Sequence, residues 1–154
     1  SGMKIIGLIS DTHGLLRPEA LGGLTGSDYI LHAGDVGDDT VLERLVLIAP
    51  VTAVRGNVDK EGRAACLPGT ARLDVDGVHI FLIHNLAGFD HVRHAPADVV
   101  VYGHSHKPAV YEQDGIVFIN PGSAGPRRFR LPVTVGRITI ADGRVTPQII
   151  EIEP

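Results

Sequence analysis

Cysteine is almost absent from this sequence, since Cys66 is the single one among 154 residues. An internal disulfide is therefore excluded, and the chain suits a reducing compartment, so we expect it in the cytoplasm. Cys66 itself is expected to be a small buried hydrophobic residue. The sequence also lacks an apolar run long enough to span a membrane and any stretch like a secretory signal peptide, so no membrane partner is expected.

Positive charge is also in short supply. Fourteen Lys and Arg residues stand against eighteen Asp and Glu, which gives a formal net charge of −4 at pH 7. This balance argues against a broad electrostatic surface for nucleic acid. It leaves open a nucleotide, or the end of a nucleic acid, as a ligand.

The length and the 44% hydrophobic content are those of an ordinary globular domain that buries its core without disulfides. We predict one domain over residues 3–154. Ser1 and Gly2, which precede Met3, are interpreted as the remnant of a cleaved tag and are left out of the fold prediction.

The first third of the sequence alternates between strand and helix signals. Residues 3–10, 28–35 and 51–57 are short apolar runs that favour buried strands. Between them, a proline-led start over 17–24 and an acidic first turn with apolar periodicity over 38–49 predict helices.

From about residue 70 the pattern changes to short strands joined by turns. The pairs Asp76-Gly77, Asp114-Gly115 and Asp142-Gly143 each separate two apolar stretches, which is a hairpin signal. The fold class predicted from this order is α/β, with βαβ units first, antiparallel strands after them, and two sheets packed face to face between helices.

Five of the predicted strands are followed by Asp, His or Asn. These residues are Asp11 and His13, then Asp35, then Asn57, then His84, and finally His104 and His106. Successive clusters are 20 to 27 residues apart, which is enough for a chain to cross over and return to the same edge of a sheet. Because ligand sites of α/β sheets lie outside the carboxyl ends of the strands, we expect all seven side chains to converge.

Carboxylate, amide and imidazole groups without thiolate are ligands for Mn²⁺, Fe, Zn²⁺ or Ni²⁺. Seven such groups are too many for one catalytic ion with an open position, but they suit two ions about 3.5–4 Å apart, and we assign the bridging carboxylate to Asp35. Strand alternation is expected to place His104 and His106 on one face, about 6.6 Å apart, so that each serves a different ion. The nucleophile predicted at such a site is a metal-bridging hydroxide.

Several segments together resemble the calcineurin-like metallophosphoesterases, in particular the small single-domain phosphodiesterases of bacteria and archaea. They are SDTHG (10–14), HAGDVGD (32–38), VRGNVD (54–59), LIH (82–84), GHSHKP (103–108) and NPGSAGPRR (120–128). The resemblance implies the metallo-dependent phosphatase fold, a four-layer sandwich of two mixed β-sheets flanked by helices. It also implies hydrolysis of phosphate esters with two metal ions. The ligands implied for the first ion are Asp11, His13 and His106, and those for the second are Asn57, His84 and His104, with Asp35 bridging.

Two departures from the family pattern concern the reaction. Val58 replaces a histidine that many larger members carry after the GN pair, and that histidine is thought to protonate the leaving group. The chain is therefore expected to favour substrates whose leaving group needs little protonation, or to use another acid. Leu86 replaces the second histidine of an HGH motif, so metal binding through His84 should survive while substrate contacts differ.

Other polar residues have two interpretations each. The turn NPGS could direct N–H groups at a phosphate, so Asn120, Gly122 and Ser123 are predicted to contact the substrate. Arg127 is predicted to clamp a phosphate, although the stretch with Arg128 and Arg130 also fits a solvated basic loop.

The remaining histidines and one aspartate are also ambiguous. His32 is expected to pack in the core behind the site, and Asp59 to orient a ligand or to cap a turn. His91 and His94 are spaced to share one helical face, where either could supply the missing acid or simply face solvent.

We therefore predict a two-metal phosphodiesterase in which Asp35, Asn57 and His84 act through the ions and the bridging hydroxide. Mn²⁺ is the first choice of ion, with Ni²⁺, Zn²⁺, Fe or Mg²⁺ as alternatives. The expected partner is a small phosphodiester, including a nucleotide, and a homodimer is compatible with the sequence. The competing hypotheses are a metal-dependent phosphomonoesterase and a non-catalytic scaffold of the same fold, as in a eukaryotic retromer subunit.

Overall fold

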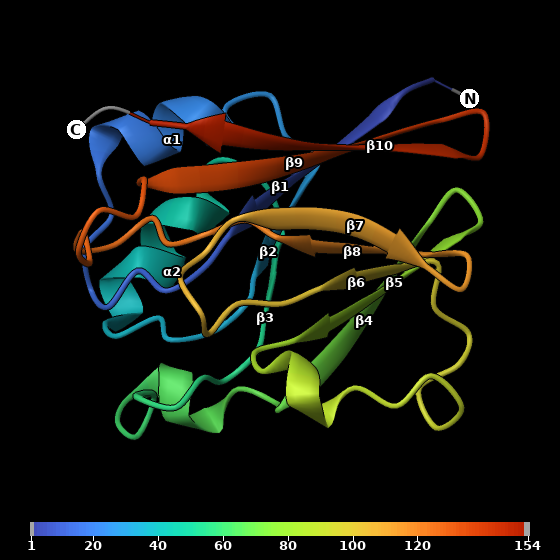
Figure 1. Cartoon of the computed structure of the whole chain (residues 1–154). Coiled ribbons are helices and arrows are strands. Elements are labelled where there is room, and N and C mark those ends of the chain that lie inside the picture. The colour runs from blue at the N-terminus through green and yellow to red at the C-terminus, as the bar shows by residue number, and fades with distance from the viewer. Residues whose placement is uncertain (1, 153–154) are drawn as a thin grey trace.

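The apolar runs of the first third form the parallel part of a mixed sheet in the computed structural model, which describes residues 2–152 (Figure 1). Strands β1 (Lys4–Ile9), β2 (Tyr29–His32) and β3 (Val51–Ala53) are parallel. Strands β9 (Thr134–Ala141) and β10 (Arg144–Glu151) extend this sheet by antiparallel pairing next to β1, which gives the order β10-β9-β1-β2-β3. Helices α1 (Pro18–Leu24) and α2 (Asp39–Val46) connect the parallel strands.

The second half of the chain supplies another mixed sheet. Strands β4 (Thr70–Val75), β5 (Val78–Ile83), β6 (Val99–Val101), β7 (Ala109–Gln113) and β8 (Ile116–Asn120) are arranged in the order β4-β5-β6-β8-β7. Strands β5, β6 and β8 are parallel, and the two edge strands pair antiparallel.

The three predicted hairpins are confirmed, and their turns explain the sequence. In each Asp-Gly pair both residues have positive φ, between 48° and 53° for the aspartates and between 73° and 83° for the glycines. A two-residue turn of this kind needs left-handed backbone at both central positions, which Asp tolerates and Gly adopts freely. These turns fix the register of β4 with β5, β7 with β8, and β9 with β10.

The main core lies between the two sheets. Leu8 and Leu31 of the first sheet and Ile80, Val99 and Ile119 of the second belong to one buried cluster. A second cluster lies between the first sheet and helices α1 and α2. The α/β sandwich of two mixed sheets is thus confirmed.

The outer layer of the second sheet is thin. It consists of residues 86–97, with one 3₁₀ turn, Leu86–Gly88, and of Phe89, which packs against Phe81 and Phe118. Residues 91–94 form a turn, so the helical face expected for His91 and His94 is not formed. Among the described residues, 2–152, no helix is both long and apolar enough to cross a membrane.

Two sequence expectations are wrong in detail. Cys66 is exposed, because it ends the short 3₁₀ helix Arg63–Cys66 on the surface. The strands also end before their polar clusters: β2 stops at His32, β3 at Ala53 and β6 at Val101. The polar residues singled out by the sequence therefore lie on loops that follow the strands.

Candidate metal centre

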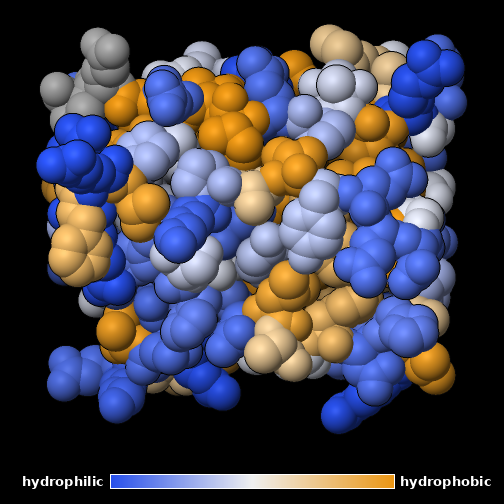
Figure 2. All heavy atoms as spheres, in the orientation of Figure 1, coloured by the Kyte–Doolittle hydropathy of each residue, from blue (hydrophilic) through white to orange (hydrophobic). Residues whose placement is uncertain are grey.

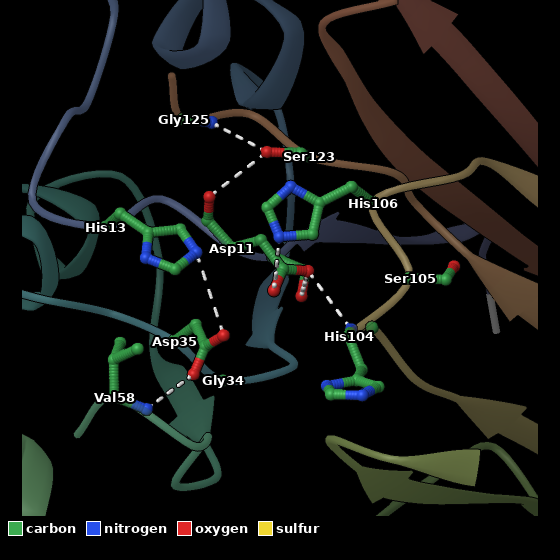
Figure 3. A network of polar contacts seen from close by, with 12 residues as sticks. Asp11, His13, Gly34, Asp35, Val58, His104, Ser105, His106, Ser123 and Gly125 are labelled. Carbon is green, nitrogen blue, oxygen red and sulfur yellow. Dashed lines mark hydrogen bonds and ion pairs between the residues drawn. The ribbon is translucent and has the colours of Figure 1, made fainter. Parts of the chain in front are cut away.

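The loops that follow β1 and β2 of the first sheet and β6 of the second meet at one place (Figure 3). They bring Asp11, His13, Asp35 and His106 together with His84, which follows β5. This convergence confirms the argument that carboxyl ends of parallel strands gather side chains that are distant in sequence.

Asp11, His13 and His106 form the first group. One ligand atom from each lies within 4.8 Å of the others. The Nε2 atom of His106 is 3.5 Å from Oδ1 of Asp11, and the His13 and His106 ring centroids are 5.4 Å apart.

Asp35 lies between this group and a second one. Its Oδ2 atom is 3.6 Å from Nε2 of His13 and 3.4 Å from Nε2 of His84. Asp11, Asp35 and His84 again offer ligand atoms within 4.8 Å of one another, and all three residues are buried. A carboxylate in this place can serve two adjacent ions.

Asp11, Asp35 and His84 share one arrangement. In each side chain one polar atom is hydrogen-bonded to the protein, and the other polar atom points into the cluster. Ser10 Oγ donates to Asp11 Oδ2 at 2.7 Å, and Val58 N donates to Asp35 Oδ1 at 3.0 Å. Nδ1 of His84 is 2.7 Å from the Ala33 carbonyl oxygen, so it carries the proton and leaves Nε2 as a lone-pair donor.

Several polar atoms of this cluster lack hydrogen-bond partners. Asp11 Oδ1, His13 Nε2 and His84 Nε2 are buried without one. An unpaired buried polar group is costly, and several that converge are explained by a shared cation. Oxygen and nitrogen donors without sulfur match a divalent ion such as Mn²⁺. The residues present therefore fit the metal ions that the resemblance implies.

Burial and neighbouring charges pull the protonation of this cluster in different directions. Burial raises the pKa of Asp11 and lowers the pKa of His106. Burial would also raise the pKa of Asp35, but the nearby His84 imidazole and the hydrogen bond from the Val58 N–H outweigh it and hold that pKa well below its usual range. The same contact with Asp35 overcomes burial at His84 and raises its pKa.

Five of the seven sequence-identified residues have left-handed backbone. The φ angles are 55° for Asp11, 48° for His13, 56° for Asp35, 76° for His104 and 66° for His106. This conformation costs a non-glycine residue about 1 kcal/mol or more and recurs at functional sites. It also corrects the expectation of strand alternation at His104 and His106, because both lie on a loop after β6 and are directed by their own φ angles.

His104 and Asn57 lie at the exposed side of the cluster. The imidazole of His104 points away from Asp11 in Figure 3 and meets the His84 ring edge-on at 5.3 Å. Its backbone N–H donates to Asp11 Oδ2 at 3.2 Å. Asn57 is exposed on the loop after β3, next to the Val58 N–H that binds Asp35.

Glycines allow these loops to approach one another. A Cβ atom on Gly56 would collide with the backbone nitrogen and Oδ1 of Asp35. Gly37 has a φ of 90°, and a side chain there would run into the backbone of His13 and Gly14. The RGN motif therefore needs glycine for close packing on Asp35, and the GDVG motif needs it where its loop passes His13 and Gly14.

Asp59 caps its own turn and also joins that turn to the loop after β2. Its buried carboxylate accepts the N–H groups of Val36 at 3.2 Å, Gly37 at 3.0 Å and Gly56 at 2.9 Å. Ser10 and Thr12, which the sequence analysis did not single out, also support the site. Their only signal is their position on either side of Asp11.

The NPGS turn lies behind the site and its polar atoms are already bonded. The Asn120 amide donates to the Gly103 carbonyl at 3.2 Å and to Ser105 Oγ at 3.1 Å, and its oxygen accepts the Gly122 N–H at 2.9 Å. Ser123 Oγ donates to the Asp11 carbonyl at 3.1 Å. The predicted substrate contacts of Asn120, Gly122 and Ser123 are corrected, because these groups hold the loops that carry the cluster.

Arg127 lines a hollow of about 270 Å³ together with Pro126, Arg128, His13 and His106. Two guanidinium groups beside this cluster suit an anionic ligand.

Comparisons to known proteins place the chain in a family. The profile of the calcineurin-like phosphoesterase superfamily domain matches residues 3–143. A probable metallophosphoesterase of Methanocaldococcus jannaschii is 31% identical over 167 residues, covering 99% of this chain and 83% of that protein. Phosphodiesterase YfcE of Escherichia coli K12 is 32% identical over 164 residues, covering 88% and 87%.

A solved structure of another protein has the same fold. Vacuolar Protein Sorting 29 from Cryptosporidium parvum has a TM-score of 0.75 with this chain at 22% identity, over 98% of each chain. At that identity the likeness concerns the fold alone. The family match and the two relatives decide the membership: the chain belongs to the calcineurin-like phosphoesterase superfamily.

Proposed function

We propose that this protein is a phosphodiesterase that depends on two divalent cations. The observation that carries the proposal is that Asp11, Asp35 and His84 are each fixed through one polar atom while the other converges on a shared centre. The first ion is assigned to Asp11, His13 and His106, and the second to Asn57, His84 and His104, with Asp35 between them.

When bound, the ions would lower the pKa of a water molecule toward neutrality and offset the charge of a phosphoryl group. The protein supplies the orientation. Arg127 and Arg128 line the hollow beside His13 and His106, where they can hold the non-bridging oxygens of a phosphate. His84, locked by the Ala33 carbonyl, keeps its Nε2 atom directed at Asp35.

The preference for a diester is supported by the relative phosphodiesterase YfcE, and Val58 bears on the leaving group. Its side chain is 48% exposed beside the Asp35 carboxylate and has no proton to give. A substrate with a good leaving group, such as a nitrophenyl diester, needs less protonation than a poor one. A phosphomonoesterase is the alternative reaction at the same centre, and the ratio of the two activities decides between them.

The test uses metal-free protein assayed with bis-p-nitrophenyl phosphate and p-nitrophenyl phosphate, each with Mn²⁺, Ni²⁺, Zn²⁺, Fe²⁺ or Mg²⁺ added. We expect metal-dependent cleavage that favours the diester and is highest with Mn²⁺. His84→Ala should abolish it, whereas His79→Ala, at the other end of the same strand and paired with Asp74, should not.

Metal stoichiometry gives a readout that is independent of activity. Wild type should bind two ions per chain, and Asn57→Ala or His104→Ala should retain only the ion held by the buried group. Two bound ions with no hydrolysis of either ester would favour a non-catalytic scaffold. Absence of bound ions would overturn the metal centre itself.

A further inference from the structure

An unusually placed aromatic side chain lies next to the proposed active site. Phe129 is 91% exposed, the highest value among the large hydrophobic residues of the described chain. It has a φ of 54°, a left-handed conformation that is rare for a bulky side chain. A single exposed apolar residue needs no explanation by itself, but a strained one beside a catalytic centre suggests a binding role.

The turn that carries Phe129 is fixed by internal hydrogen bonds. The Leu131 N–H donates to the Arg128 carbonyl at 3.1 Å, and Nε of Arg127 donates to the Leu131 carbonyl at 3.2 Å. The Gly125 carbonyl, at the base of the turn, accepts from Arg17 at 3.2 Å. Phe129 is therefore presented on a structured turn.

The surroundings of Phe129 are strongly basic, although the chain as a whole is acidic. Arg128 and Arg130 are its neighbours in sequence, and Lys107 lines the same hollow as Phe129, Arg130 and Leu131. Figure 2 shows strongly hydrophilic groups around an apolar protrusion at the left edge, where the loop before β9 lies in Figure 1. The net charge of −4 makes this local excess of cations distinctive.

This second hollow is lined by chain neighbours of residues at the candidate metal centre. Lys107 directly follows His106, and Phe129 directly follows Arg128, so both walls of the second hollow are chain neighbours of residues that line the first. This adjacency in the chain places Phe129 next to a residue that lines the hollow at the candidate metal centre.

We propose that the segment Arg127–Arg130 is a nucleoside platform that selects nucleotidic phosphodiesters, with a base stacked on Phe129 and phosphate oxygens held by the flanking arginines and Lys107. Basic side chains combined with an exposed aromatic ring are the elements that bind single nucleotides and strands. The platform rests on the proposed phosphodiesterase function and names its substrate class. Neither an isolated phosphate nor an aliphatic diester would use the ring.

The test compares two substrates that share one leaving group. Thymidine 5′-(4-nitrophenyl phosphate) and methyl 4-nitrophenyl phosphate both release 4-nitrophenolate, which departs with the electron pair of the broken P–O bond as water oxygen bonds to phosphorus. We expect wild type to prefer the nucleoside ester in kcat/KM, mainly through KM. Phe129→Ala should lower that preference about tenfold, because base stacking is lost.

Two further variants make the result specific. Phe129→Tyr keeps an aromatic face and should retain the preference. Leu47→Ala removes another apolar side chain, 85% exposed after helix α2, and should leave the preference as in wild type. An equal preference in wild type and Phe129→Ala would overturn the platform while leaving the phosphodiesterase function intact.

If wild type hydrolyses neither ester, the phosphodiesterase function fails and binding still decides the platform. In titration calorimetry without added metal, the dinucleotide TpT should bind wild type more tightly than dimethyl phosphate, and Phe129→Ala should lose most of the difference. Equal affinities would reject the platform. The alternative ligand of this surface is a second copy of the chain, which sedimentation detects. A wild-type dimer that dissociates in Phe129→Ala, with unchanged substrate preference, would assign the surface to that contact.

Discussion

His32 shows how one buried residue behind the site can set the geometry of two loops. Thr12 Oγ1 donates to the Val36 carbonyl at 2.8 Å, so the 3.0 Å contact between His32 Nε2 and that hydroxyl must use a proton on Nε2. Nδ1 accepts the Gly34 N–H at 3.1 Å. The ring is thus held neutral, in one tautomer, between the loops that follow β1 and β2.

This arrangement predicts a pH dependence of stability. Burial, the largest cause, lowers the pKa of His32 to about 4 from an ordinary 6.5. Below pH 6.5 the unfolded chain takes up a proton that the folded chain refuses, so this contribution is complete above pH 6.5 and is lost as the pH falls toward 4. The loss amounts to about 3 kcal/mol in the free energy of unfolding.

Urea unfolding of wild type and His32→Asn between pH 7.5 and 4 isolates this contribution. The asparagine oxygen can accept the Gly34 N–H but does not titrate. Wild type should lose about 3 kcal/mol relative to the variant across this range. Parallel curves for the two proteins would show that His32 is not the residue responsible.

The loop after β6 depends on the strand beside it. Asn120 ends β8 and binds Gly103 and Ser105 of the loop that presents His104 and His106. Strand β8 therefore supports the candidate metal centre without contributing a proposed ligand to it.

Asn120→Ala should destabilise the protein by about 2–4 kcal/mol, because the Gly103 carbonyl and the Gly122 N–H lose their buried partner. It should also weaken metal binding, since the loop with the two histidines loses its support. Thr134→Val is the matched control: its hydroxyl donates to Pro121 at 2.6 Å in the same region, and removing it should lower stability but not ion affinity. Denaturant unfolding and metal titration of both variants separate the two effects. Equal ion affinities in wild type and Asn120→Ala would contradict the supporting role.

The sequence predicted the helices, strands and turns that are determined by residues close together in the chain. Asp76-Gly77 and its two counterparts specify hairpins by turn chemistry, and the apolar runs before Asp11 and Asp35 specify buried strands. The backbone conformation of His104 and His106 could not be predicted in this way. Their positive φ angles depend on contacts such as the bond from His104 N–H to Asp11, 93 residues away.

Distant contacts also explain why the sequence wrongly predicted substrate contacts for Asn120, Gly122 and Ser123. A turn with exposed N–H groups and a turn with internally bonded ones have the same sequence signature, and only the neighbouring loop decides between them. The sequence also could not predict that the layer over the second sheet is a loop and not a helix. Apolar residues such as Leu86 and Phe89 can cover a sheet from either structure.

The whole molecule is organised around a centre that joins its two sheets. Asp11, His13 and Asp35 follow strands of the first sheet, while His84 and His106 follow strands of the second. Ions bound by both sets would link the sheets at one end of the sandwich, in addition to the apolar core between them. Cations should therefore act on global stability as well as on activity.

Adding Mn²⁺ to metal-free protein should raise the melting temperature, because the ions bind the folded state and the separated ligands of the unfolded chain bind them poorly. At an ion concentration 100 times Kd the gain is about 2.7 kcal/mol. For a chain of this length that corresponds to roughly 5–10 °C, measured by scanning calorimetry and reversed by a chelator. His84→Ala, which removes a proposed ligand after β5, should lose most of the shift, whereas His79→Ala, within β5, should keep the full shift. Equal shifts in the two variants would mean that the stabilising ion lies elsewhere, and that the two sheets are joined by their apolar core alone.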